Sequence, residues 1–344
     1  MPLNHTILDV LKFKGLNGRD VINEVIASNP AYTGNDAIGN SIPVSYDTVP
    51  TETFDALYRI DNPDIDPFRK INAGAGSSKG NYETRRYHID TVTRYFWIDQ
   101  ALTRRNAEAG ARLLEAECAN GVEAVQNGLE RQFFYGGQKA NSNASTLGFQ
   151  GLQTLIDKDM MFNAGGTGSA LASAYLVNFN TRNGVTWLFG NQGETEFGQP
   201  VEDDIPDPKD PTKMIPVLKT KFEFYPGLAF LSRFAASRIA NIDTATAYTV
   251  AKNREAFTDE HIATAISRWP YGTPNAILMP KAAGLMLAAS RTVSRVVGVG
   301  GGGGDVMVQA GFVSLPKDHD GIPIAYSNAQ IIGEKLVPNT AFPD

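Results

Sequence analysis

The chain has 344 residues, of which 42% are apolar and 20% charged, and its net charge is −6 at pH 7. This length allows two compact domains or one elaborated domain, and the composition excludes wholesale disorder and a collagen-like rod. The single cysteine, Cys118, excludes an internal disulfide and a zinc site built from cysteines. The acidic balance argues against a free-standing nucleic-acid-binding protein, and no apolar stretch approaches the roughly 20 residues that span a membrane.

The first ninety residues contain two segments that are poor in core residues. Residues 1–40 begin with a short amphipathic stretch and continue with Asn, Gly and Pro, which is typical of an arm. Residues 41–92 contain two extended stretches on either side of the Gly-rich segment 73–80, which predicts a long hairpin. We expect both segments to bury little apolar surface within their own subunit and to gain most of it from neighbours.

The strongest pattern predicts a helix over 99–134, a stretch without proline. Apolar residues recur there every three or four positions: Ala111, Leu114, Cys118, Val122, Val125, Leu129 and Phe133. A single straight rod of this length would measure about 54 Å. Gly110, Gly121 and Gly128 share one face, and each costs about 1 kcal/mol relative to alanine, so we expect another backbone to pass close to that face.

The rest of the chain predicts a mixture of strands and helices. Strands are expected at 174–179, 185–189, 221–225, 228–231, 275–279 and 322–326, and helices at 259–268 and 281–291. The turn residues at 180–184 predict that the first two strands form a hairpin. Five prolines and four aspartates make 200–216 an expected exposed loop. The predicted fold class is therefore α+β.

Motifs for catalysis or cofactor binding are missing from the sequence. The Gly-rich segments 73–80 and 300–304 lack the Gly-Lys-Ser/Thr of a phosphate loop and the strand-before, helix-after order of a dinucleotide site. The four histidines are too scattered for a metal-binding helix face. Residues 318–321 have side chains that a cation could use, but they fit better a polar turn before a strand. We expect no catalytic residue, cofactor or metal, and Cys118 in the core.

The order of these parts resembles the major capsid proteins of tailed bacteriophages, with the Hong Kong 97-type fold that also forms the herpesvirus capsid floor. The segments that carry the resemblance are Leu129–Gly137, Gly148–Leu152, Leu176–Asn180, Gly227–Leu231, Arg238–Asp243 and Gly321–Tyr326. The resemblance covers nearly the whole chain, but it rests on element order and short phrases rather than on an invariant motif.

The resemblance implies a fold with four parts. These are an N-terminal arm at 1–40, an extended hairpin loop at 41–92, a peripheral domain at 93–242 and 321–344 with its spine helix at 99–134, and a mixed α/β axial domain at 243–320. The arm and hairpin would lie across adjacent subunits. The axial domain would pack around the local five- and six-fold axes.

The resemblance also implies a function without enzymatic activity. The chain would self-assemble as hexamers and pentamers into an icosahedral shell around double-stranded DNA, in the host cytoplasm, and would remain in the virion. Its other expected partners are a separate scaffolding protein, a portal and decoration proteins, with no membrane. Two alternatives stay open: a small-molecule enzyme using the α/β region, and another virion structural protein such as a tail or decoration protein.

Positive charge is concentrated just before and at the start of the predicted long helix. The residues are Arg85, Arg86, Arg94, Arg104, Arg105 and Arg112. Because a shell coexists with packed phosphate, one interpretation is that some of these arginines face DNA and contact it non-specifically. The alternative is that they pair, within or between subunits, with Glu83, Asp90, Asp99, Glu108 and Glu115.

Overall fold

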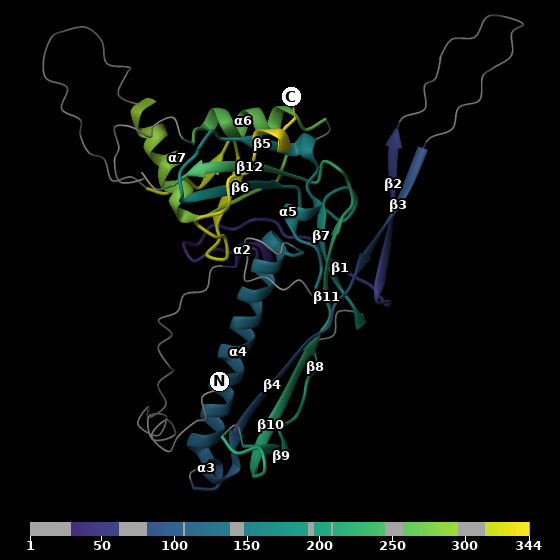
Figure 1. The fold of residues 1–344 in the computed structure, drawn as a ribbon, viewed down its shortest axis with the longest axis vertical. Helices are drawn as coiled ribbons and strands as arrows, with labels where there is room; N and C mark the ends of the chain where they lie inside the picture. The colour runs from purple at the N-terminus through teal and green to yellow at the C-terminus, as the bar shows by residue number, and fades with distance from the viewer. Residues whose placement is uncertain are drawn as a thin grey trace, which may run out of the picture.

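The computed structural model describes residues 29–61, 81–105, 107–137, 148–191, 196–207, 209–244, 257–270, 272–294 and 314–343. They form an α+β fold with an upper body and a long lower extension (Figure 1). Most of the expected arm, the tip of the expected hairpin and the glycine run 300–304 lie outside the described residues. None of the described helices is long and apolar enough to cross a membrane.

A six-stranded sheet forms the centre of the upper body. Its order is β14 (Asp318–His319), β15 (Ile322–Tyr326), β13 (Ala276–Met279), β6 (Leu171–Val177), β12 (Ala236–Asp243) and β5 (Met161–Asn163). Every residue of β6 and β13 is buried, as expected for strands that are covered on both faces. Helices α6 (Asp259–Ser267) and α7 (Lys281–Ser294) pack against it (Figure 1).

The domain boundary expected at residue 243 passes through this sheet. Strand β13 is hydrogen-bonded on one side to β15, with Ile277 opposite Ile324, and on the other side to β6, with Ile277 opposite Leu176. Strands β5, β6 and β12 therefore share one layer and one apolar core with β13 and β15.

A second sheet is centred on β10 (Met214–Phe224) and runs down the extension (Figure 1). Strand β4 (Val92–Asp99) pairs with it on one side, and β8 (Glu196–Phe197) and β9 (Val201–Pro206) pair with it on the other. The expectation of a loop at 200–216 is wrong, because this segment is an exposed β9–β10 hairpin. Pro206 fits because it ends the edge strand, where a missing N–H breaks no ladder.

The hairpin expected across 180–184 is also wrong, although both of its strands exist. The turn reverses the chain, with the Gly184 N–H donating to the Asn180 carbonyl at 3.2 Å. However, β6 pairs with β12 and β13, whereas β7 (Val185–Phe189) pairs with β1 (Tyr46–Thr48) and β11 (Pro226–Phe230) in a separate sheet. The turn therefore passes the chain from one sheet to another.

The expected long helix is observed as α3 (Gln100–Arg105) and α4 (Ala107–Tyr135), so a single straight rod is wrong. A Cβ built on Gly110 would lie 2.8 Å from the Cα of Thr103. Seven residues along one straight helix are about 10 Å apart, so α3 folds back on the start of α4. With 29 residues, α4 alone is about 44 Å long and forms the axis of the extension.

Two apolar clusters lie at opposite ends of α4. The lower cluster consists of Ile98, Leu102, Ala109, Leu113, Leu114 and Cys118, and it confirms Cys118 as a core residue. The upper cluster contains Leu129 and Phe133 together with the upper body. No residue of α4 between 119 and 128 is buried, although Val122 and Val125 touch the upper cluster.

The three helix glycines have different surroundings. The Thr103 backbone approaches Gly110 as expected, but at Gly121 the neighbour is the ring of Phe96, on which an added Cβ would clash. No described atom lies within 4 Å of a Cβ built on Gly128, so the expected close approach is wrong there.

Substitution of two of these glycines gives opposite expected results. Gly128→Ala should raise the free energy of unfolding by about 1 kcal/mol, because it adds helix propensity in open space. Gly121→Ala should lower it by about 2 kcal/mol, because Phe96 must move. Urea denaturation of the two variants measures both changes, and equal stability of the two would contradict the packing at Gly121.

Residues 29–61 and 81–92 pack against their own subunit, so the expectation of low burial is wrong for this part. Ala31, Ile42, Val49, Tyr58 and Tyr87 belong to the upper apolar cluster, and each is at most 7% exposed. Helix α2 (Pro30–Thr33) docks because the indole of Trp187 donates a 2.8 Å hydrogen bond to the Ala31 carbonyl.

The stretches expected to form a hairpin in 41–92 pair antiparallel as β2 (Thr53–Asp61) and β3 (Asn81–His88). On one face of this hairpin, the Tyr87 hydroxyl donates to the Phe230 carbonyl at 2.7 Å. The other face exposes Leu57 and Tyr82, which are 69% and 56% accessible.

Trp187→Phe tests the docking of α2. The indole also contacts the rings of Tyr32, Phe133 and Phe149. Loss of the N–H donor and of ring volume should lower the free energy of unfolding by about 2 kcal/mol. Amide exchange at residues 31–34 should also accelerate. Trp97→Phe, at a half-buried position outside this cluster, serves as the control; equal effects of the two changes would contradict the prediction.

Candidate functional site

Three of the six singled-out arginines pair within the described chain. Arg86 forms a bidentate ion pair with Asp55 at 2.7 and 3.0 Å, and its hydrogen bond lowers the pKa of the Asp55 carboxyl group. Arg112 pairs with Glu108 one helical turn away at 2.8 Å. Arg85 lies 3.4 Å from Glu83 and stacks over the ring of Tyr58.

Arg94, Arg104 and Arg105 are exposed, and none of them makes an ion pair with a described residue. Arg94 lies on β4, and the other two lie in the last turn of α3, at the lower end of the molecule (Figure 1). The structure therefore separates the six: Arg85 and Arg86 lie on the β2–β3 hairpin, and the rest lie on the extension.

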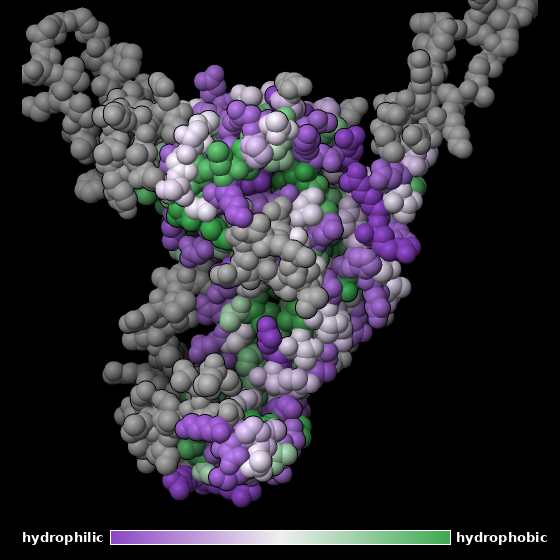
Figure 2. All heavy atoms as spheres, in the orientation of Figure 1, coloured by the Kyte–Doolittle hydropathy of each residue, from purple (hydrophilic) through white to green (hydrophobic). Residues whose placement is uncertain are grey.

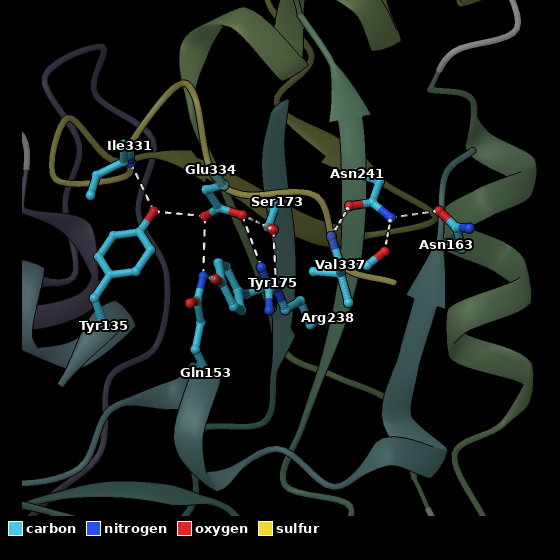
Figure 3. Close-up of polar contacts among 10 residues, drawn as sticks. All are labelled: Tyr135, Gln153, Asn163, Ser173, Tyr175, Arg238, Asn241, Ile331, Glu334 and Val337. Carbon is cyan, nitrogen blue, oxygen red and sulfur yellow. Dashed lines mark hydrogen bonds and ion pairs between the residues drawn. The ribbon is translucent and has the colours of Figure 1, made fainter. Parts of the chain in front are cut away.

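A buried polar network that the sequence did not indicate fastens the C-terminal segment to the upper body (Figure 3). Glu334 is 5% exposed and accepts hydrogen bonds from Arg238 at 2.9 Å and from the Tyr135 hydroxyl at 2.8 Å. Ser173 donates to the same carboxylate, and Gln153 donates to it at 3.2 Å. Burial raises the pKa of Tyr135, so its hydroxyl remains a donor.

Asn241 extends this fastening along the C-terminal segment (Figure 3). Its amide donates to the Val337 carbonyl at 3.0 Å and accepts from the Val337 N–H at 2.9 Å. It also donates to Asn163 at 2.9 Å. The network joins the sheet, α4 and residues 331–337, and the ion pair of Glu334 with Arg238 at its centre is buried.

A carboxyl group of α4 is buried without a good partner. Glu130 is fully buried, and neither of its oxygens makes a well-formed hydrogen bond with a described residue. Burial raises its pKa to about 8, while the nearby Ser327 hydroxyl and the backbone of Ala31 and Tyr32 oppose the shift. The group lies between α4, α2 and the 326–330 segment.

The turn expected at 318–321 is present as part of the β14–β15 hairpin. Its His319 lies 2.7 Å from Asp259, which also holds Arg291 at 2.7 Å. Although burial opposes it, hydrogen bonds from Arg291 and His319 lower the pKa of Asp259. These contacts tie α6, α7 and β14 together, and the described residues include no group of His, Cys, Asp and Glu that could hold a metal ion.

Comparison with known proteins identifies the family. The family model described as "Major capsid protein GP7" matches residues 26–297. The chain belongs to this family of major capsid proteins. No curated protein matches the capsid protein in sequence.

A solved structure has the fold of this capsid protein, and two others are less similar to it. A chain in the near-atomic-resolution structure of bacteriophage Epsilon15 is 17% identical, with a TM-score of 0.57 over 97% of each chain. A chain of the bacteriophage JBD30 capsid is 11% identical over 80% of this chain and 88% of that one, with a TM-score of 0.43. A chain of the SrpI encapsulin complex from Synechococcus elongatus is 11% identical over 71% of this chain and 97% of that one, with a TM-score of 0.43.

The family resolves the expectations about identity. The resemblance to tailed-phage capsid proteins is confirmed, and the protein is a structural, non-enzymatic component of the virion capsid. The open alternatives of a small-molecule enzyme and of a tail or decoration protein are therefore excluded. The α+β class is confirmed at the level of the whole fold.

A surface cavity of about 490 Å³ lies between α6, β5 and the C-terminal residues of the capsid protein. His261 lines it, but its Nδ1 lies 3.0 Å from the Thr258 hydroxyl at the start of α6, and burial lowers its pKa. Arg268 stacks over the ring of Phe162. Both side chains therefore make contacts within the protein.

Proposed function

We propose that this capsid protein self-assembles as hexamers and pentamers into an icosahedral shell that encloses double-stranded DNA. The observation that carries the proposal is the family match over residues 26–297. Exposed apolar side chains support it: Leu57 and Tyr82 on the β2–β3 hairpin, and Val201 and Met214 on the β9–β10 hairpin, are all more than half exposed. Exposed apolar groups on projecting hairpins are typical of surfaces that meet a partner.

The four parts would have different places in the shell. The arm at 1–40 and the hairpin at 41–92 would lie across adjacent subunits, and the peripheral domain at 93–242 and 321–344 would form the wall. The axial domain at 243–320 would surround the local five- and six-fold axes. Because β13 shares the sheet of β6 and β12, the axial and peripheral parts would move together as one upper body.

The proposed partners are a separate scaffolding protein, a portal, decoration proteins and non-specifically bound DNA, with assembly in the host cytoplasm. Of the six arginines, Arg85, Arg86 and Arg112 pair with described residues, whereas Arg94, Arg104 and Arg105 make no ion pair within the described part of the chain. The last three are therefore the proposed contacts to groups outside the chain.

Sedimentation and electron microscopy of the purified protein test this proposal. The expected result is a closed particle of megadalton mass, alone or with its co-expressed scaffolding protein. The comparison is a β2–β3 surface variant, Leu57→Asp with Tyr82→Asp, which changes two exposed side chains. Assembly into particles should be lost in that variant while its thermal unfolding stays unchanged. A wild-type protein that remains a small species in every condition would overturn the proposal.

A further inference from the structure

The lower end of the extension carries two patches of opposite charge. The basic patch consists of Arg104 and Arg105 in α3. The acidic patch consists of Glu202 and Asp204 in β9. All four side chains are exposed, and none makes an ion pair with a described residue. Figure 1 shows α3 and β9 at the same end of the molecule.

The register of the lower sheet places both patches on the same side. Glu202 lies opposite Leu218, which lies opposite Ile98, and directly opposed residues project from the same face. Ile98 and Leu218 pack with Leu102 of α3 in the lower apolar cluster, so this is the face that α3 covers. Asp204, two residues along β9, shares the face with Glu202.

The opposite face of the same strands is already neutralised. Asp203 projects there and binds Lys219 at 3.0 Å. Lys221 and Glu223 form a second ion pair on that face. On that face Asp99 makes no ion pair with a described residue, but its carboxylate accepts a hydrogen bond from the Ala101 N–H at 2.8 Å. The exposed charged side chains of β9 that have no described counter-charge therefore lie on the α3 side.

We propose that the lower ends of neighbouring subunits bind each other there, with Arg104 and Arg105 of one copy facing Glu202 and Asp204 of the next. A surface that presents both signs side by side is complementary to a second copy of itself. DNA fits it less well, because the two carboxylates on the same face repel the phosphates that the arginines would attract. The contact rests on the proposed shell function, in which copies lie side by side.

The free edge of β9 supports the same partner. Among the described strands, β9 pairs only with β10, which leaves one row of its backbone groups without a strand. Charged side chains on such an edge prevent indiscriminate strand pairing. Glu202 and Asp204 thus select a partner that carries arginines.

Charge reversal tests the contact. The first variant, Arg104→Glu with Arg105→Glu, makes both patches acidic, and the second, Glu202→Lys with Asp204→Lys, makes both basic. Each variant alone should associate at least about tenfold more weakly than wild type, because like charges would face each other. An equal mixture of the two should restore association, since every acidic patch then meets a basic one. The restored association should weaken in 1 M salt.

Controls separate this contact from folding and from shell formation. Lys158→Glu with Arg182→Glu changes the net charge by the same amount as the arginine variant, but at exposed positions of the upper body. This control should leave association unchanged. Thermal unfolding should be equal for all variants. The proposed contact would be overturned if both reversal variants associated normally, or if their mixture associated no more strongly than either variant alone. It would also be overturned if association were lost in the arginine variant only, which would indicate that the arginines bind DNA. If the wild-type protein forms no shell, the proposed shell function is wrong. Sedimentation of the mixture, compared with each variant alone, still shows whether the lower ends of the extension bind each other.

Discussion

Replacing Glu334 with alanine is expected to lower the free energy of unfolding by about 3–5 kcal/mol. The substitution leaves the guanidinium of Arg238, which is 5% exposed, buried without its counter-charge. Removal of one partner from a buried ion pair costs this much because the remaining charge is still out of water. Ser173 and Tyr135 also lose their acceptor, and residues 331–337 lose one of their attachments to the sheet, while the hydrogen bonds between Asn241 and Val337 remain.

Urea denaturation measures this loss of unfolding free energy, and two further variants serve as comparisons. Glu108→Ala removes an exposed pair with Arg112 and should cost less than about 1 kcal/mol. The double variant Glu334→Leu with Arg238→Met should be more stable than Glu334→Ala, because no unpaired charge is left inside. A Glu334→Ala protein as stable as Glu108→Ala would show that the network of Figure 3 does not hold the C-terminal segment.

Glu130→Gln is expected to remove a large part of the pH dependence of stability. Burial raises the pKa of Glu130 from 4.5 to about 8 in the folded protein. Between these two pH values the unfolded chain has released the proton and the folded chain has kept it, so stability falls as pH rises. Each pKa unit is worth about 1.4 kcal/mol, and the full loss of stability, roughly 5 kcal/mol, is reached above pH 8.

The difference between Glu130→Gln and wild type isolates this group from all other titrating groups. The variant should gain little at pH 4.5 and most at pH 8.5, because its amide stays neutral throughout. Glu108→Gln, an exposed position on the same helix, should show no such trend. A stability difference that is constant from pH 4.5 to pH 8.5 would contradict a buried, proton-holding Glu130.

Local patterns in the sequence predicted most of the helices and strands correctly. The wrong predictions concern which other helices and strands they contact. The strand at 185–189 is where its apolar run places it, but nothing in that run shows that its partners are β1 and β11 rather than β6. Similarly, periodicity identified the helix at 99–134 but not the fold-back of α3, which depends on the contact of Thr103 with Gly110. The hydrophobic period is a local property of the chain, whereas the pairing of strands and helices depends on the assembled core.

The polar sites show the same limit more strongly. Glu108 and Arg112 are one helical turn apart, so their pairing follows from spacing. Asp55 and Arg86 meet only because the hairpin register sets them opposite each other. Arg238 and Glu334 are 96 positions apart, and no signal in the sequence links them. In contrast, the order of the predicted arm, hairpin, long helix and strands along the chain indicated the family. That order can be read without knowing which strands or side chains pair.

The separation of the two apolar clusters along α4 determines how the protein should melt. Among the described residues, six buried ones form the lower cluster, and the stretch of α4 between the two clusters has no buried residue. Partly buried side chains, Val122, Val125 and Phe96, make the contact between them, and Phe96 packs against both clusters. We expect the extension to open at a lower denaturant concentration than the upper body, in a separate cooperative step. The three tryptophans report this directly, because Trp97 lies on β4 in the extension whereas Trp187 and Trp269 belong to the upper cluster. An emission curve that combines all three would show two overlapping transitions, and its apparent midpoint would belong to neither unit.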